Sequence, residues 1–189
     1  MKLIVGMTGA TGAPLGVSLL QALKAIPEVE THLVMSKWAQ TTIKLETPYT
    51  AEEVRQLADV CYAPNDQAAA ISSGSFKTDG MIIIPCSMKT LAGIRAGYAD
   101  GLIGRAADVI IKEHRKLILV PRETPLSTIH LENMLALSQQ GVRMIPPMPA
   151  WYTNPETIED IKHHIIARLL DQFDLEYPDT KRWQGLPHQ

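Results

Sequence analysis

The sequence predicts a single-domain α/β protein built on a doubly wound, mostly parallel sheet. The chain has 189 residues, a length that suits one ordinary domain and is short for two. Hydrophobic residues make up 46% and charged residues 20%, as in a globular protein rather than a disordered one. Short apolar runs alternate with stretches of helical pattern, and this alternation indicates βαβ units.

The predicted strands are short apolar segments bounded by turn residues. Because these segments are nearly continuous in apolar character, we expect helices on both faces of a Rossmann-like sheet of at least five strands. The strands are expected at residues 3–7, 32–35, 81–85, 117–121 and 143–145.

Seven helices are expected in the segments around these strands. They fall at residues 13–25, 37–46, 52–57, 88–95, 102–113, 127–139 and 156–172. We expect one domain over residues 1–176. The polar tail over residues 177–189 contains Trp183, and this aromatic residue favours docking on a neighbouring subunit.

Charge and composition exclude several classes of function. The formal net charge is −2, so we expect no basic surface for nucleic acid. The apolar N-terminus is interrupted by glycines and therefore predicts strand, turn and helix rather than a signal peptide. There is no apolar run of membrane-spanning length, and two cysteines do not suggest a disulfide framework. A cytoplasmic protein without membrane or nucleic-acid partners is expected.

The loop over residues 6–12, Gly-Met-Thr-Gly-Ala-Thr-Gly, leaves the first strand and opens the first helix. Glycines permit a tight turn, while backbone amides and the helix N-terminus offer donors to a phosphate. Thr8 and Thr11 add hydroxyls. Spacing alone leaves phosphate binding and a plain turn equally open, and the lysine of a P-loop is absent.

Two later loops also follow predicted strands, where ligands of doubly wound sheets bind. Ser36 could contact a ligand oxygen, but its role as the N-cap of the next helix is favoured. In the loop 85–90, Ser87 and Thr90 place hydroxyls at a helix start. Cys86 is interpreted as a small buried residue rather than a nucleophile, because no nearby histidine in the sequence could activate it.

Charged residues in the second half of the chain differ in what they predict. Arg105, Asp108 and Lys112 share one helix face, a pattern typical of a salt-bridged surface. Arg122 and Glu123 stand at a strand end between prolines, and there a functional role is favoured. Tyr152 and Arg168 could hold a phosphate, but spacing alone favours packing and ion pairing for them.

Eight stretches spread along nearly the whole chain carry recognisable motifs. They are Gly-Ala-Thr-Gly at 9–12, Ser-Ser-Gly-Ser-Phe at 72–76, Pro-Cys-Ser-Met-Lys-Thr at 85–90, Arg-Ala-Ala-Asp at 105–108, Lys-Glu at 112–113, Arg-Glu at 122–123, His-Leu-Glu-Asn-Met at 130–134 and Pro-Pro-Met-Pro-Ala-Trp-Tyr at 146–152. In this order they resemble the UbiX-type flavin prenyltransferases, in particular the members associated with phenolic acid decarboxylases.

The resemblance implies that the chain joins the dimethylallyl group of dimethylallyl phosphate to N5 and C6 of reduced FMN, without a metal. It also implies a homo-dodecamer, and prenylated FMN delivered to a UbiD-type decarboxylase. The implied FMN-binding residues are Gly9, Ala10, Thr11, Ser36, Ser87, Met88, Lys89, Thr90 and Arg122. Tyr152 and Arg168 would bind dimethylallyl phosphate across a subunit interface, and the implied catalytic residues are Glu123, Lys112, Arg122 and Thr11.

The chain departs from the family at Thr11, where serine is common, and at Trp151, where phenylalanine is common. Two alternatives remain open at this point. One is an FMN-dependent cysteine decarboxylase of the same architecture, although such enzymes carry Pro-Ala-Ser-Ala-Asn-Thr in place of the 85–90 motif and an upstream histidine. The other is a non-catalytic FMN carrier, which would not need Tyr152, Arg168 or Glu123.

Overall fold

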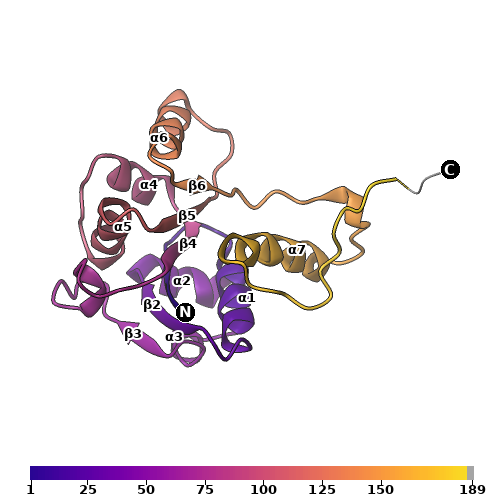
Figure 1. The fold of residues 1–189 in the computed structure, drawn as a ribbon, viewed down its shortest axis with the longest axis horizontal. Helices are drawn as coiled ribbons and strands as arrows, with labels where there is room; N and C mark the ends of the chain where they lie inside the picture. Colours follow the sequence, from indigo (N-terminus) through magenta and orange to yellow (C-terminus); the bar gives the residue numbers. More distant parts are fainter. Residues whose placement is uncertain (187–189) are drawn as a thin grey trace. The chain divides into compact units, whose positions relative to one another are not determined.

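A computed structural model describes residues 1–186, and within them one six-stranded, fully parallel sheet has the order β3-β2-β1-β4-β5-β6 (Figure 1). This confirms the predicted α/β class. The strands are Lys2–Met7 (β1), Glu30–Met35 (β2), Val60–Tyr62 (β3), Gly80–Cys86 (β4), Lys116–Pro121 (β5) and Arg143–Met144 (β6). The helices are Ala13–Lys24 (α1), Lys37–Glu46 (α2), Ala51–Arg55 (α3), Met88–Arg95 (α4), Leu102–Lys112 (α5), Thr128–Gln139 (α6) and Ile158–Leu170 (α7), with 3-10 turns at Ala70–Ser72 (η1), Trp151–Thr153 (η2) and Asp171–Phe173 (η3).

All five predicted strands are present, and β3 is the strand that the sequence did not reveal. It has three residues, lies at the sheet edge and is only partly buried. Such a short, half-exposed segment carries neither an apolar run nor a clear alternation. Its parallel pairing with β2, from His32 opposite Val60 to Val34 opposite Tyr62, holds it in place.

The chain reverses direction across the sheet between β1 and β4. From β1 it moves outward through β2 to β3, and then it returns to β4 on the other side of β1 and continues to β5 and β6. Right-handed crossovers in opposite directions put their helices on opposite faces. In Figure 1, α1 and α5 accordingly lie on opposite sides of the strands. The carboxyl ends of β1 and β4 therefore form a topological switch point, where ligands bind in such sheets.

The centre of the sheet is almost completely buried. Every residue of β4 is buried, as are all residues of β1 and β5 after the first. Leu91 of α4 and Ile110 of α5 belong to the same apolar cluster, which covers one face. This rigid centre fixes the positions of the loops that leave β1 and β4.

Contacts divide the chain into two compact units, Met1–Pro146 and Pro147–Gln189, which we describe separately. The sheet and its helices belong to the first unit, and η2, α7 and η3 belong to the second. Helix α7 ends at Leu170, before the predicted residue 172, because the chain tightens into η3 and reaches a left-handed Asp174 (φ 57°). The expected domain over residues 1–176 stays a prediction. Residues 187–189 of the expected tail lie outside the described residues.

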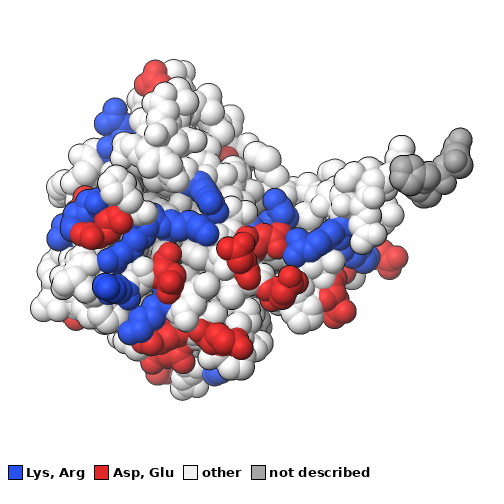
Figure 2. Space-filling view, viewed as in Figure 1, with Lys and Arg blue, Asp and Glu red and all other residues white. Residues whose placement is uncertain are grey.

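The surface and the helix lengths bear on the expected partners. On the face drawn in Figure 2, lysine and arginine side chains are interspersed with aspartate and glutamate. None of the helices within residues 1–186 has the length and apolar character needed to cross a lipid bilayer.

Candidate functional site: a cavity at the carboxyl ends of β1, β2 and β4

The loops that follow β1, β2 and β4 meet around a cavity of about 620 Å³ in the first unit. This volume falls within the ~300–1,000 Å³ typical of small-molecule sites. The three loops and the first turns of α2 and α4 contribute Thr8, Gly9, Ser36, Lys37, Trp38, Ser87, Lys89 and Thr90 to its wall. The segments at 64–65 and 100–104, with Gly93 and Tyr98, complete it. The cavity therefore lies where the sheet rule places a ligand.

Thr8 ties the end of β1 to the end of β4. Its hydroxyl donates to the carbonyl of Pro85 (2.7 Å) and accepts from the amide of Ser87 (2.8 Å), and its own amide donates to Pro85 (3.2 Å). The side chain is 3% exposed. Since both of its hydrogen-bonding roles are taken within the protein, Thr8 shapes the cavity wall rather than offering its hydroxyl to a ligand.

Gly9 allows the first loop to pass against α2. A Cβ at this position would collide with the Cβ of Trp38, so no larger residue fits without a shift of the backbone. Trp38 itself is largely exposed, and together with Tyr98 it gives the cavity an aromatic lining. Aromatic faces of this kind suit a planar ring system.

The N-terminus of α1 is occupied by a carboxylate from the protein. Glu46 Oε2 accepts hydrogen bonds from the amides of Gly12 (2.8 Å) and Ala13 (2.9 Å). The helix N-terminus was considered as one source of phosphate donors in this loop, and Glu46 takes up two of its amides. No local pattern indicates this contact, because Glu46 lies 33 residues or more away at the end of α2.

Ser36 and Ser87 cap the helices that follow them. Ser36 Oγ accepts from the Ala39 amide (3.0 Å), which confirms the predicted cap. Ser87 Oγ accepts from the Thr90 amide (3.3 Å) and pairs with Thr90 Oγ1 (3.0 Å). A hydroxyl that caps a helix can still contact a second partner, and all three residues face the cavity.

Three predicted FMN contacts, Met88, Ala10 and Thr11, differ from the rest in position. The side chain of Met88 is 8% exposed and belongs to the apolar core, so that only its backbone could face a ligand. Ala10 and Thr11 stand in the loop between Gly9, which lines the cavity, and Gly12 at the start of α1, and Thr11 is exposed.

Cys86 is fully buried, and this burial raises the pKa of its thiol to about 12. Its Sγ lies 3.6 Å from the Ser87 carbonyl. A thiol that remains protonated at neutral pH is not a nucleophile. The structure confirms the interpretation of Cys86 as a structural residue.

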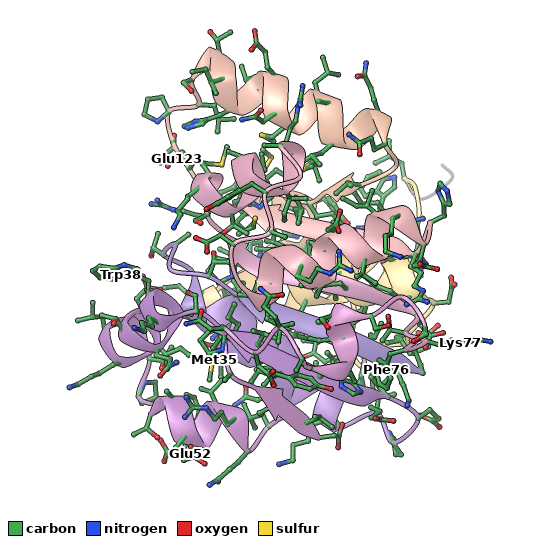
Figure 3. All side chains as sticks on the ribbon, turned by 90° about the vertical axis from the view of Figure 1, so that its left-hand side faces the viewer. Met35, Trp38, Glu52, Phe76, Lys77 and Glu123 are labelled. Atoms are coloured by element: carbon green, nitrogen blue, oxygen red, sulfur yellow. The ribbon has the colours of Figure 1, made fainter. Side chains whose placement is uncertain are left out.

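Arg122 and Glu123 follow β5 at the same edge of the sheet as the cavity. The Arg122 amide donates to the Cys86 carbonyl (3.3 Å), one residue before Ser87 of the cavity wall. Glu123 accepts from the adjacent Thr124 amide (3.1 Å), and both side chains are exposed. Figure 3 shows Glu123 on the same side of the molecule as Trp38.

Lys112 lies at the other end of the sheet. It pairs with Glu113 at the end of α5, just before β5 begins at Lys116. Arg115, three residues later, donates to the Phe76 carbonyl (2.9 Å), and Figure 3 shows Phe76 on the side opposite Glu123. The length of β5, roughly 15–20 Å at 3.3 Å per residue, separates Lys112 from Arg122. One chain therefore does not bring these two residues together.

The helix stripe that contains Lys112 behaves as predicted for a salt-bridged face. Arg105 Nη1 donates to Asp108 Oδ2 (2.7 Å), and Arg105 Nε donates to the Ser72 carbonyl (3.0 Å). Hydrogen bonding to Lys112 and the charge of its ammonium hold the pKa of Glu113 below its usual range.

Tyr152 and Arg168 belong to the second unit. The Tyr152 ring packs edge-to-face against His164 (centroids 5.7 Å apart) and Trp183 (5.8 Å). Arg168 Nη1 donates to Asp171 Oδ2 (2.7 Å). Desolvation by burial, followed by the charge of Arg168, lowers the pKa of His164, so its imidazole is neutral at pH 7.

Sequence reasoning missed part of the cavity wall. Asn65 was missed because the strand before it, β3, was not recognised. Tyr98, Asp100 and Gly101 lie in the link between α4 and α5, and the lining residues up to Gly104 lie in the first turn of α5. The signal for this segment was the spacing of Gly97, Gly101 and Gly104. Within residues 1–186, no group of three or more His, Cys, Asp or Glu side chains could hold a metal ion.

Comparison with known proteins defines the class first. The flavoprotein family model matches residues 1–170. A curated relative from Escherichia coli, named "Probable UbiX-like flavin prenyltransferase", is 76% identical over 187 residues, which cover 99% of this chain and 95% of the relative. The chain therefore belongs to the flavoprotein family and, within it, to the UbiX-like flavin prenyltransferases, which confirms the resemblance seen in the sequence.

Solved structures agree with this placement. A dodecameric FMN-dependent UbiX-like decarboxylase from Escherichia coli O157:H7 is 76% identical, with a TM-score of 0.97 over 98% of this chain and 100% of that one. AnUbiX (PadA1), solved in complex with FMN and dimethylallyl pyrophosphate, is 55% identical, with a TM-score of 0.96 over 98% of each chain.

Proposed function

We propose that this protein is a flavin prenyltransferase that joins the dimethylallyl group of dimethylallyl phosphate to N5 and C6 of reduced FMN. The observation that carries the proposal is the cavity at the switch point of the sheet, in a chain 76% identical to a UbiX-like flavin prenyltransferase. The complex of AnUbiX with FMN and dimethylallyl pyrophosphate supports FMN and a dimethylallyl donor, which in that complex is the pyrophosphate.

The residues around the cavity suit FMN. Gly9, Ala10 and Thr11 would contact it from the first loop, and Ser36 from the second. The loop at the start of α4 would add Ser87, Lys89, Thr90 and the backbone of Met88, with Arg122 at the neighbouring strand end. Hydroxyls, amides and cations of this kind bind the phosphate and the polar ring edge, while Trp38 and Tyr98 offer apolar surface. No metal is required by this donor set.

Reduced FMN supplies the nucleophilic positions, and the protein would stabilise the charges that develop. Breaking the allylic C–O bond builds negative charge on the departing phosphate, which the Arg122 guanidinium would offset. Glu123 is placed beside Arg122 and would accept a proton released as the new bonds form, a role that the free phosphate could share. Thr11 would complete the loop at the reacting end of the flavin.

Lys112 can join this site only from another subunit, because β5 separates it from Arg122 in its own chain. We therefore include in the proposal a homo-dodecamer, because the Escherichia coli O157:H7 relative is described as dodecameric. The site of one subunit of this protein would then draw on a neighbouring chain. Tyr152 and Arg168 would hold dimethylallyl phosphate, and the tail over residues 177–189 would belong to the assembly.

Prenylated FMN would then pass to a UbiD-type decarboxylase in the cytoplasm. The transfer to a UbiD-type decarboxylase is proposed from the family. A second function, decarboxylation, is tested directly. The Escherichia coli O157:H7 relative is described as a decarboxylase, which keeps an FMN-dependent decarboxylation, such as that of a C-terminal cysteine, as the alternative. A carrier that binds FMN without modifying it is the third outcome.

Mass spectrometry of the flavin decides among these functions. The purified protein is incubated anaerobically with reduced FMN and dimethylallyl phosphate or the diphosphate, and the flavin is then extracted. A gain of one five-carbon unit supports the prenyltransferase. Unmodified FMN with both prenyl donors would refute it, and release of CO₂ from a cysteine peptide in a parallel reaction would establish the decarboxylase.

Glu123→Gln tests the site. We expect it to retain FMN binding and to lower turnover by about 10²–10⁴-fold, the usual contribution of a general base. Glu52→Gln is the control, because Glu52 pairs with Arg55 on the exposed surface of α3. Wild-type turnover in Glu123→Gln would remove Glu123 from the proposed mechanism.

A further inference from the structure

The segment that follows η3 folds back onto its own unit. Thr180 Oγ1 donates to the Tyr177 carbonyl (2.6 Å), and the Tyr177 ring stacks on His163 of α7 with centroids 4.3 Å apart. His163 Nε2 lies 2.9 Å from the Pro178 carbonyl, and Lys181 Nζ donates to the Thr153 carbonyl of η2 (3.4 Å). Residues 177–183, the tail strap, are thus fixed to both α7 and η2.

One carboxylate joins the strap to Arg168. Asp171 receives two hydrogen bonds from Arg182, Nη1 to Oδ2 (3.0 Å) and Nη2 to Oδ1 (2.8 Å), and a third from Arg168 Nη1 to Oδ2 (2.7 Å). The Asp171 side chain is only 16% exposed, whereas those of Arg168 and Arg182 are 54% and 45% exposed. The carboxylate therefore sits beneath two guanidinium groups and determines where both lie.

The charges in this cluster do not cancel. Hydrogen bonding from Arg182 holds the pKa of Asp171 below its usual range, so Asp171 is ionised at neutral pH. Two guanidiniums and one carboxylate leave an excess of one positive charge, and neutral His164 adds none to it. Arg168 gives one of its five N–H groups to Asp171 and presents a half-exposed guanidinium, which is suited to a phosphate.

The next residue of the strap, Trp183, contacts Tyr152, the second residue proposed to bind the prenyl phosphate. Trp183 packs edge-to-face on Tyr152, with centroids 5.8 Å apart and planes at 74°. Tyr152 also packs edge-to-face on His164, with planes at 89°. A phenol in contact with two rings loses rotational freedom before a ligand arrives, which lowers the entropic cost of binding.

We propose that Arg182 and Trp183 are positioning residues for the prenyl phosphate: Arg182 acts through Asp171 on Arg168, and Trp183 acts on Tyr152. This inference rests on the proposed function, in which Tyr152 and Arg168 hold dimethylallyl phosphate. Arg182 donates two N–H groups to Asp171, so its proposed role is to hold that carboxylate in place rather than to bind the phosphate directly. Two consecutive residues of the strap thus orient both phosphate-binding side chains, Arg168 and Tyr152.

The test is substitution within the strap, with FMN and the prenyl donor titrated separately. Arg182→Leu and Trp183→Ala are expected to raise the KM and the calorimetric Kd for dimethylallyl phosphate about tenfold or more, since small misplacements of a clamp are costly. The Kd for FMN and the subunit assembly should stay at wild-type values. Trp183→Phe, which keeps a ring, should restore most of the affinity, and Gln184→Ala, next to Trp183 and exposed, is the matched control.

A double-mutant cycle identifies the route through Asp171. If Arg182 acts only through that carboxylate, Arg182→Leu should add little to the effect of Asp171→Asn. Unchanged dimethylallyl phosphate affinity in Arg182→Leu and Trp183→Ala would overturn the inference, as would equal losses of FMN binding or assembly. Failure of the wild type to prenylate FMN would refute the proposed function instead, and the calorimetric Kd would still test the positioning.

Discussion

Replacement of Thr8 by valine should loosen the junction between β1 and β4 without changing the volume of the side chain. In the native protein the Thr8 hydroxyl donates to Pro85 and accepts from Ser87, so a single buried oxygen joins the ends of two neighbouring strands. Valine removes that oxygen and both hydrogen bonds. The Pro85 carbonyl keeps one donor, the Thr8 amide at 3.2 Å, whereas the Ser87 amide loses the acceptor that the hydroxyl provided.

The expected cost follows from the donor that loses its partner. A buried N–H without an acceptor costs about 1–3 kcal/mol, and we take about 1–2 kcal/mol because the Ser87 contact is only partly buried. For a chain of this length, each kcal/mol corresponds to about 2–4 °C in Tm. Thr8→Val should therefore melt about 2–8 °C below the wild type, and FMN affinity should fall because Ser87 lines the cavity.

Thermal unfolding by circular dichroism at one fixed protein concentration measures the effect, because assembly makes Tm depend on concentration. Thr41→Val is the control. Thr41 is exposed and its hydroxyl makes one long contact, 3.4 Å to the Lys37 carbonyl, so its loss should change stability by less than about 0.5 kcal/mol. If Thr8→Val and Thr41→Val melt together, the hydroxyl of Thr8 does not hold the two strands.

Three further predictions concern Gly9, the cysteines and Asp171. Gly9→Ala should weaken FMN binding about tenfold or more in a flavin titration, because the added Cβ would overlap that of Trp38. Gly93→Ala is the control and should have a smaller effect, because its Cβ would meet only the Tyr98 carbonyl, at 3.4 Å. Equal effects of the two variants on FMN binding would contradict the reasoning. Iodoacetamide should alkylate exposed Cys61 in the native protein and Cys86 only after denaturation, as read by peptide mass mapping, because burial raises the pKa of Cys86 to about 12. The lowered pKa of Asp171 means that its ion pairs stabilise the fold above the unfolded pKa of about 4 and lose that contribution as pH falls through the folded pKa. The Tm difference between wild type and Asp171→Asn should thus be present at pH 7 and vanish in acid, and a difference independent of pH would argue against the ion pairs.

Several elements could be predicted from the sequence because local chemistry defines them. Helices α2 and α4 occur with the predicted bounds. Ser36 and Ser87 precede them as side-chain N-caps and so mark where each helix begins. Strands β1, β4 and β5 could be predicted because their sequences are apolar runs, as buried parallel strands require. Strand β3 could not be predicted, because its three residues depend on pairing with β2 for their conformation.

The candidate site divides along the same line. The loops after β1, β2 and β4 were identifiable in the sequence, because parallel strands bring their carboxyl ends to one edge and each loop carries hydroxyls or glycines there. The family itself was recognisable from short motifs in a fixed order, which the flavoprotein match over residues 1–170 confirms. The individual roles of the site residues stay predictions that the variants above test.

The α/β class, the order of the main elements and the family could all be predicted from the chain alone, because periodicity, caps and motifs are local properties. The folded structure was needed to see which distant groups meet: Glu46 at the amides of Gly12 and Ala13, Thr8 between two strands, and Arg182 with Arg168 on Asp171. It also placed Lys112 at the far end of β5 from Arg122. Such contacts depend on how the helices and strands pack in space. The number of residues between two side chains along the chain does not fix the distance between them in the folded protein.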